Sequence, residues 1–326
     1  MLYPITFSIP SKKIVKKIPN KTKVLSSLIP GDELTYIYKT EKSYYKEYQK
    51  SMFAVTKKKA GWDCMRHYEI LANGCIPVFV GLEDCHRKVL ELFPKDLVIE
   101  GTKMFYKLEG KEIEDITEGE MEDYLVLANK LLEYTKEKLT TKSLAQYVID
   151  IVDGRNLEKI LLINPPPDSR KKGSDYLRDL ITHGFKEIYK NDCHSFPNID
   201  FIYKDWEGET NYLNGKGMTY VRNIDPKLRN EYQEGEIEYN IKNKYYDLII
   251  YTNWHRGLSY YDLANKIYDP SKIVMMQGED EIYWDNYFIY ADKHPTFIRE
   301  VYPGDINKEG IFIDWTHEYE KYWATP

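Results

Sequence analysis

A charged stretch between residues 57 and 69 carries the residue types that bind phosphate and sugar groups. Three consecutive lysines, Lys57, Lys58 and Lys59, are followed by Arg66 and, three residues later, by Glu69. Basic side chains pair with phosphate oxygens, and a carboxylate accepts hydrogen bonds from sugar hydroxyls. Because residues three apart project from one face of a helix, the spacing favours a phosphorylated-sugar site. An ordinary surface ion pair between Arg66 and Glu69 explains the same spacing equally well.

The sequence around this stretch predicts a strand, a basic turn, a helix and a second strand. The apolar runs 53–56 and 76–80 are typical of buried strands, and Gly61 lies in the turn between the first strand and the helix. Residues 65–72 have helical spacing, and Asn73-Gly74 is typical of a helix end, where glycine accepts the left-handed conformation. An anion at the start of this helix would meet the helix dipole and the cations together. The unit is half of a doubly wound α/β domain.

The segment from Gly61 to Phe79 resembles the donor-binding segment of exostosin-like glycosyltransferases, most closely those of large DNA viruses and algae. The resemblance is carried by an arginine, a glutamate, a run of small residues and the sequence Gly-Cys-Ile-Pro-Val at 74–78. It implies that Arg66 holds the phosphates of a nucleotide sugar and that Glu69 holds its ribose or sugar. An upstream glutamate found in many related GT-B enzymes is replaced here by Gly61, and Asp63 is the candidate substitute.

Composition limits the classes of protein that fit. The 326 residues are enough for two domains, and 42% of them are hydrophobic, with no apolar stretch long enough to cross a bilayer. The first residues lack the pattern of a secretory signal. Four cysteines without a Cys-x-x-Cys pair are typical of reduced thiols, so we expect a cytoplasmic protein, in the host cytoplasm if it is viral. A net charge of −6 argues against nucleic-acid binding.

The first half of the chain continues the α/β pattern. A strand at 24–29 ends in Pro30-Gly31-Asp32, and Gly31 and Asp32 are candidate ligand contacts because ligands bind at the carboxyl ends of parallel strands; an ordinary turn is the alternative. The family resemblance extends over roughly residues 4–100. The remaining expectations are helices at 43–51, 88–93, 121–138 and 144–152, a strand at 97–100 and a polar surface segment at 103–119.

A second α/β half begins after a predicted boundary near residue 155. We expect its strands at 159–164, 199–203, 247–251 and 272–276 and its helices at 174–188 and 260–267. Two Rossmann-like halves facing a cleft form the GT-B architecture. Residues 1–155 would then be the donor-binding domain and residues 156–326 the acceptor-side domain.

The order of the two halves is the reverse of the usual one, in which the donor-binding half comes second. The segment 294–303 resembles the family segment that leads into a Tyr-Pro-x-x-Phe-Ser-Ile-Pro run, and that run is found here at 3–10. The sequence therefore looks circularly permuted, which neighbouring termini tolerate. A fragment of tandem copies and a gene fusion are the alternatives.

Inverting sugar transfer needs a base for the acceptor proton and cations for the leaving diphosphate. Glu279 and Asp280 follow a predicted strand within a Gly-Glu-Asp sequence that resembles the family, and a solvated acidic loop is the alternative. His255 is the second candidate base, and Arg256 beside it is a candidate phosphate or acceptor contact. Arg299-Glu300 resembles a family pair for which we expect a hinge or cleft role.

These features predict a glycosyltransferase that moves a sugar from a nucleoside-diphosphate donor to a glycan or glycoprotein acceptor, without an essential metal. The sequence contains neither zinc-ligand spacing nor a nucleotide-binding phosphate loop. An inactive nucleotide-sugar-binding or scaffold module derived from such an enzyme is the alternative. A methyltransferase-type Rossmann domain in the second half is disfavoured, because the sequence after its first strand is proline-rich instead of glycine-rich.

Overall fold

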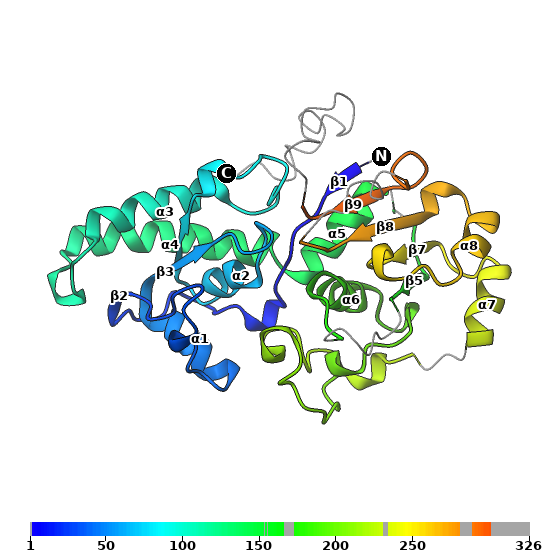
Figure 1. Cartoon of the computed structure of the whole chain (residues 1–326), viewed down its shortest axis with the longest axis horizontal. Coiled ribbons are helices and arrows are strands. Elements are labelled where there is room, and N and C mark those ends of the chain that lie inside the picture. The colour runs from blue at the N-terminus through cyan, green and yellow to red at the C-terminus, as the bar shows by residue number, and fades with distance from the viewer. Residues whose placement is uncertain are drawn as a thin grey trace.

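The computed structural model describes residues 2–152, 154, 156–165, 173–230, 234–280 and 289–300. The chain forms an α/β protein with two parallel sheets, one of three strands and one of six. Figure 1 shows the smaller sheet with helices α1 to α4 on the left and the larger sheet with α6 to α8 on the right. None of the helices in the described part of the chain is long and apolar enough to cross a membrane.

The smaller sheet has the strand order β2-β3-β4, with all neighbours parallel. Its central strand is buried along most of its length, as expected for an apolar run covered on both faces. The strands are β2 (Lys23–Leu25), β3 (Ser51–Lys57) and β4 (Ile76–Val80). The accompanying helices are α1 (Glu41–Lys50), α2 (Met65–Ala72), α3 (Lys95–Leu108) and α4 (Glu118–Lys138).

The predicted unit around the charged stretch is confirmed. Helix α2 ends where the sequence indicates: Gly74 has a φ of +63°, and its amide donates to the Leu71 carbonyl at 3.0 Å. Helix α4 starts with a capping box in which Thr117 and Glu120 each satisfy a backbone N–H of the other. Local sequence signals therefore determine both helix boundaries.

The larger sheet has the order β6-β5-β7-β8-β9-β1, again with all neighbours parallel. Helix α5 packs against α6 at a close contact, where a Cβ on Gly184 would lie 2.0 Å from the Thr141 carbonyl oxygen, so only glycine fits. The strands are β1 (Leu2–Pro4), β5 (Ile160–Ile163), β6 (Cys193–Phe196), β7 (Leu248–Tyr251), β8 (Ile273–Gln277) and β9 (Thr296–Ile298). The helices are α5 (Thr141–Ile151), α6 (Tyr176–Tyr189), α7 (Glu234–Lys242) and α8 (Tyr261–Ile267).

Strand β1 lies at the edge of the larger sheet, beside β9, although it comes from the start of the chain. Leu2 is in register with Thr296, and the Ile5 amide donates to the Ile298 carbonyl at 2.9 Å. The Tyr147 hydroxyl of α5 donates to the Pro4 carbonyl at 2.8 Å. Segments of the first predicted domain thus pack with the second sheet, and the boundary at residue 155 stays a prediction.

Three predicted elements are wrong. Residues 97–100, expected as a strand, lie inside α3, and residues 88–93, expected as a helix, form turns. Residues 199–203 contain a 3-10 helix, while the strand at this place in the sheet is β6. Its sequence, Cys-His-Ser-Phe, has no apolar run that would predict a strand. The polar segment at 103–119 also includes the end of α3.

Candidate functional site

The loop after β3 and the first turn of α2 form the centre of the predicted donor site. Cys64 at the helix N-cap makes no side-chain capping bond, so the helix start has no side-chain acceptor of its own. Arg66 lies in this first turn. Its Nη1 donates to Thr56 Oγ1, at the carboxyl end of β3, over 3.4 Å.

Arg66 forms no ion pair with a carboxylate among the described residues, although its charge acts on Glu69. Among the described residues, no acidic side chain lies within ion-pair distance of it, and its buried Nε has no hydrogen-bond partner. The nearby Tyr36 hydroxyl, which interacts electrostatically with Arg66, is also buried and without a partner. The surface ion pair between Arg66 and Glu69 that the spacing allowed is not formed. Two unsatisfied polar groups and a partly buried cation are the features of an anion site.

Glu69 is buried, with only 6% of its surface exposed. The Tyr44 hydroxyl donates to its Oε2 at 2.8 Å, and the Thr219 hydroxyl makes a very short bond to its Oε1. Burial raises the pKa of Glu69 above its ordinary value, although these hydrogen bonds and Arg66 oppose the shift. The carboxylate is therefore held by two hydroxyl groups, one of which comes from the second half of the chain.

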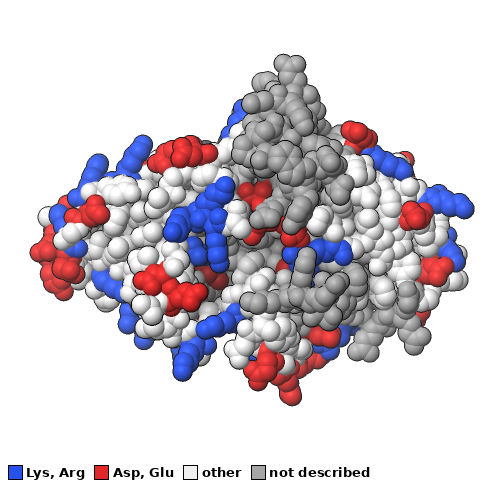
Figure 2. All heavy atoms as spheres, in the orientation of Figure 1, with Lys and Arg blue, Asp and Glu red and all other residues white. Residues whose placement is uncertain are grey.

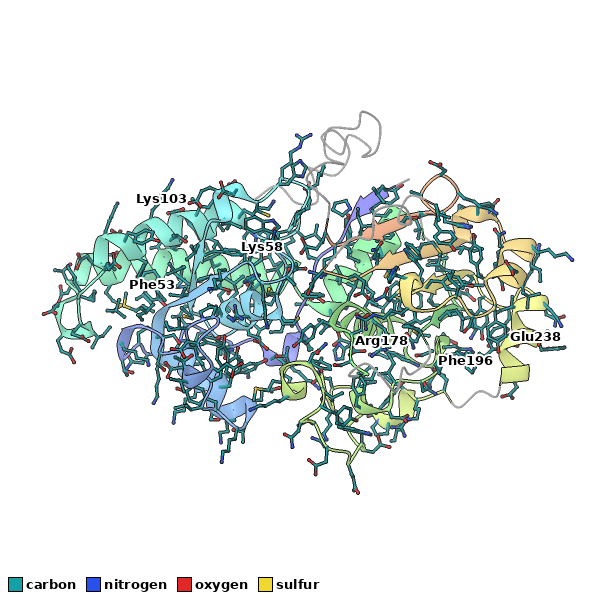
Figure 3. All side chains as sticks on the ribbon, viewed as in Figure 1. Phe53, Lys58, Lys103, Arg178, Phe196 and Glu238 are labelled. Atoms are coloured by element: carbon teal, nitrogen blue, oxygen red, sulfur yellow. The ribbon has the colours of Figure 1, made fainter. Side chains whose placement is uncertain are left out.

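The three lysines and the Gly31 turn adjoin this site. Lys57 is exposed, and a Cβ added to Gly31 would lie 3.6 Å from its Nζ, so the two turns are neighbours. Lys58 lies over the Trp62 ring, with its Nζ 5.2 Å from the ring centroid. Figure 2 shows a group of basic side chains left of the centre, in the area where Figure 3 labels Lys58. Lys57 and Lys58 therefore place positive charge in the segment that leads from β3 to α2.

Two of the predicted contacts have structural roles. The Asp32 side chain accepts from the Leu34 amide at 3.0 Å and caps a 3-10 helix at Glu33–Thr35. The backbone amide of Lys59 donates to the Gly61 carbonyl at 3.0 Å and shapes the turn before α2. Asp32 and Lys59 thus stabilise two backbone segments beside the predicted donor site.

Asp63 lies in the packed interior instead of facing a ligand. Its Oδ2 accepts from the Phe7 amide at 2.6 Å, and its Oδ1 accepts from the Tyr68 hydroxyl at 2.9 Å. Its own amide donates to Glu300 Oε1 at 2.9 Å, and its carbonyl accepts from Arg299 Nη1 at 2.9 Å. Asp63 thus joins the loop after β3 to the segment after β9.

Arg299 is the centre of this junction, with a side chain that is 0% exposed. It pairs with Glu300 at 3.0 Å and closely with Asp280, and it stacks over the Phe7 ring at 4.4 Å. Burial raises the pKa of Asp63 to about 7 and also raises the pKa of Glu300. Repulsion between neighbouring carboxylates adds to both shifts, and the Arg299 guanidinium opposes them. Arg299 and Glu300 therefore join the loop after β3 to the segment after β9, and their expected hinge or cleft role stays a prediction.

Gly61 is at the same junction. A Cβ at this position would lie 2.5 Å from Glu300 Oε1 and 3.1 Å from Asp280 Oδ1. The absence of a side chain at Gly61 therefore leaves space for Glu300 and Asp280, which follow strands of the second sheet. The carboxyl ends of β3, β8 and β9 meet here.

A second polar group lies at the carboxyl ends of β7 and β8. Glu279 forms a close ion pair with Arg256 and accepts from Asn253 Nδ2 at 3.1 Å. Asn253 also donates to Asp175 Oδ2 at 2.6 Å, at the start of α6. Burial disfavours the charged form of Glu279, but the bonds from Arg256 and Asn253 outweigh it and lower its pKa.

The three candidate bases thus lie close to one another but differ in surroundings. Glu279 is ion-paired with Arg256, and the half-exposed Asp280 is ion-paired with Arg299. His255 lies in a 3-10 helix at Trp254–Arg256, directly after β7, and is partly exposed. Their assignment as bases stays a prediction.

Sequence reasoning missed the residues that complete the surroundings of Arg66 and Glu69. Tyr44 and Tyr48 are spaced four apart in α1, and their hydroxyls are 2.9 Å from each other, which a tyrosine-rich amphipathic helix could have indicated. Thr56 follows the apolar part of β3. Thr219 has no local signal at all, because its contact with Glu69 spans 150 residues.

Neither a cluster of metal ligands among the described residues nor a similar known protein identifies a ligand for the site. Among the residues that the structure describes, no group of three or more His, Cys, Asp or Glu side chains is placed to hold a metal ion. No family model, curated protein or solved structure matches the chain.

Proposed function

We propose that this chain is a glycosyltransferase that binds a nucleoside-diphosphate sugar at the start of α2. The observation that carries the proposal is Arg66, a partly buried guanidinium at a helix N-terminus with no carboxylate partner among the described residues. Diphosphate oxygens would satisfy its free Nε and the Tyr36 hydroxyl. The helix dipole and Lys57, Lys58 and Lys59 would add to the attraction.

Glu69 would hold the ribose or sugar of the donor. Its carboxylate already accepts hydrogen bonds from two hydroxyl groups, which is the chemistry that a pair of sugar hydroxyls requires. For an inverting transfer, one of Glu279, Asp280 and His255 would take the proton of the glycan or glycoprotein acceptor. A reaction without an essential metal and a cytoplasmic location belong to the same proposal.

A GT-B architecture with exchanged halves fits the contacts between the two sheets. The loop after β3 bonds to the segment after β9 through Asp63, Arg299 and Glu300, so carboxyl ends of both sheets meet, as ligand sites between two Rossmann-like halves require. Strand β1 occupies the place next to β9 that a strand following β9 in an unpermuted chain would take. Both observations support a permuted exostosin-like enzyme.

The proposal is tested by titrating UDP, GDP and ADP, and then their sugar conjugates, by isothermal calorimetry and thermal shift. Wild type is compared with Arg66→Gln and with Glu69→Gln, which keeps the shape of the side chain. Lys103→Ala, an exposed residue of α3 (Figure 3), is the control. At 100 times its dissociation constant the ligand should stabilise the fold by ~2.7 kcal/mol.

We expect binding of one nucleotide that both site variants weaken at least tenfold and that Lys103→Ala leaves unchanged. Absence of binding by folded wild type and by the Thr219→Val variant introduced below would overturn the proposal. Hydrolysis or transfer of the donor then separates an enzyme from an inactive binding module, which would bind without turnover.

A further inference from the structure

The segment from Asn214 to Asn223, which we name the latch, has an unusual backbone. Gly215, Lys216 and Gly217 have φ values of +53°, +55° and +70°, and Thr219 and Arg222 have values of +79° and +55°. Glycine adopts such angles readily, but a β-branched residue such as Thr219 does so only at a steric cost. Residues in strained conformations persist where surrounding contacts hold them, and such positions cluster at ligand clamps and switches.

The contacts of the Thr219 amide and hydroxyl come from the other half of the molecule. Its amide donates to Glu41 Oε2 at 2.7 Å, and its hydroxyl is 2.6 Å from the Tyr45 hydroxyl and bonds closely to Glu69 Oε1. The residue is 0% exposed. Helices α1 and α2 therefore surround both polar groups of one threonine from the second half.

Further contacts hold the rest of the latch, some of them within its own half: the Arg222 amide donates to the Phe201 carbonyl at 2.9 Å, and the Asn223 amide donates to the Ile202 carbonyl at 2.7 Å. Met218 packs against the small core cluster that contains Tyr44 and Tyr48 of α1. At the other end, Lys12 Nζ donates to the Asn223 carbonyl at 2.6 Å, and Asn223 Nδ2 donates to the Thr219 carbonyl at 2.6 Å. In Figure 1 the latch lies along the lower edge of the molecule, beside α1.

We propose that the latch is an internal competitor of the donor: the Thr219 hydroxyl occupies the carboxylate of Glu69 and must leave before sugar hydroxyls bind there. This inference rests on the proposed function. With Tyr44 on one oxygen and Thr219 on the other, and 6% of the residue exposed, a ligand reaches Glu69 only by displacing one of the two. Tyr44 is part of α1, whereas Thr219 lies in an irregular segment with a strained backbone, so Thr219 leaves.

Donor binding is then coupled to the contact between the two halves. Only molecules in which the latch is open can bind the donor. The apparent affinity for the donor is therefore reduced by the fraction of molecules in the open form. Displacement of Thr219 also breaks its hydrogen bonds to Glu41 and Tyr45 of α1. Donor binding would therefore loosen the contact between α1 and the second half of the chain.

The test uses Thr219→Val, which keeps the volume of the side chain and removes the hydroxyl. Thr219→Ser restores the hydroxyl. Glu41→Gln weakens the latch from its amide side and removes a negative charge that acts on Glu69, to which Glu41 makes no hydrogen bond. Glu114→Gln, an exposed residue outside the latch, is the matched control. UDP and GDP are titrated separately into each full-length variant, and hydrogen exchange of the latch amides is followed with and without each nucleotide.

We expect Thr219→Val and Glu41→Gln to bind the preferred nucleotide at least about fivefold more tightly than wild type. Thr219→Ser and Glu114→Gln should bind like wild type, and the nucleotide should increase exchange at the Thr219 amide of wild type. Glu41→Gln supplies the answer if Thr219→Val does not fold.

Two contrary outcomes are distinguishable. If both latch variants bind the nucleotide as wild type does, or more weakly, while Glu69→Gln abolishes binding, the latch is refuted and the proposed function stands. If no variant binds UDP or GDP, including those with the latch opened, and neither wild type nor Thr219→Val binds ADP, the donor site itself is refuted and the latch with it.

Discussion

The carboxyl edges of the two sheets each present arginine side chains that are at least partly buried, yet these arginines have opposite surroundings. At the edge of the larger sheet, Arg299 and Arg256 are ion-paired with carboxylates. At the edge of the smaller sheet, the one hydrogen bond that Arg66 makes with its side chain to a described residue is the 3.4 Å bond to Thr56, and tyrosine side chains lie near it. Burial alone therefore does not distinguish a structural arginine from a binding one, whereas the charge balance around it does.

The difference assigns separate roles to the two edges. A buried ion pair is strongly destabilised when one partner is removed, because the other charge stays buried and unpaired. A cation without a carboxylate partner contributes little to the stability of the fold. Its removal should therefore change the free energy of unfolding little but weaken the binding of an anionic ligand strongly. The four predictions below test this contrast, starting with the largest expected effect.

Replacing each arginine by methionine should separate the two edges in stability. Arg299→Met leaves Asp280 and Glu300 without their cation and should lower the free energy of unfolding by about 3–5 kcal/mol. Arg66→Met should change it by less than ~1 kcal/mol. Urea denaturation measures both values. Equal losses for the two variants would remove the basis of the comparison.

Adding a methyl group at the junction should have the next largest effect. Gly61→Ala places a carbon 2.5 Å from Glu300 Oε1, in a region where Glu300 is buried and tied to Arg299, so we expect a loss of about 1–3 kcal/mol from overpacking. Gly119→Ala is the control: nothing lies within 4 Å of its added carbon, and alanine favours helix α4. A tolerated Gly61→Ala with unchanged stability would mean that the junction is looser than described.

The junction should also weaken as the pH rises. The pKa of Asp63 is raised from 3.8 to about 7, so the folded state holds this proton more tightly than the unfolded chain. The resulting stability is complete below pH 3.8 and is lost as the pH rises through about 7, at up to ~1.4 kcal/mol per pH unit. Chemical denaturation between pH 5 and 8 should show a steeper fall for wild type than for Asp63→Asn. Parallel profiles for the two proteins would contradict the raised pKa.

The smallest effect concerns the exposed lysines. Lys57→Ala should weaken pyrophosphate binding about two- to fivefold at low salt, and the loss should shrink as ionic strength rises, because exposed charges are screened. Arg66→Gln should weaken it at least tenfold at every salt concentration. Calorimetric titration at 20 mM and 300 mM salt separates the two behaviours, and a salt-independent effect of Lys57 would place it inside the site instead of at its rim.

Local signals made the centre of the fold predictable. The apolar run of β3, the periodicity of α2 and the Asn73-Gly74 helix end each depend on residues close together in sequence, and all three are confirmed. Strand β6 was missed because two of its four residues are His194 and Ser195, which are buried by tertiary packing instead of by their own hydrophobicity.

The site was predictable only in part for the same reason. Arg66 and Glu69 lie where the helix pattern indicates, but the partners that decide their roles come from distant segments. Neither the contact of Thr219 with Glu69 nor that of Asp63 with Glu300 follows from any spacing within one element. Charge and motif identified the candidate residues, and the tertiary contacts determined which of them are occupied by other parts of the chain.

The pairing of β1 with β9 has a consequence for how the protein is made. Leu2 is synthesised before every other described strand residue, yet its partner in the sheet, Thr296, belongs to the described strand that is synthesised last. The larger sheet therefore cannot be completed before β9 has been synthesised, and β9 keeps an open edge until residues 2–4 pair with it. Slow translation of the segment that contains β9 would prolong the time in which that edge is open to other chains. The yield of folded protein should therefore depend more on expression level and chaperone supply than on the stability of the folded state.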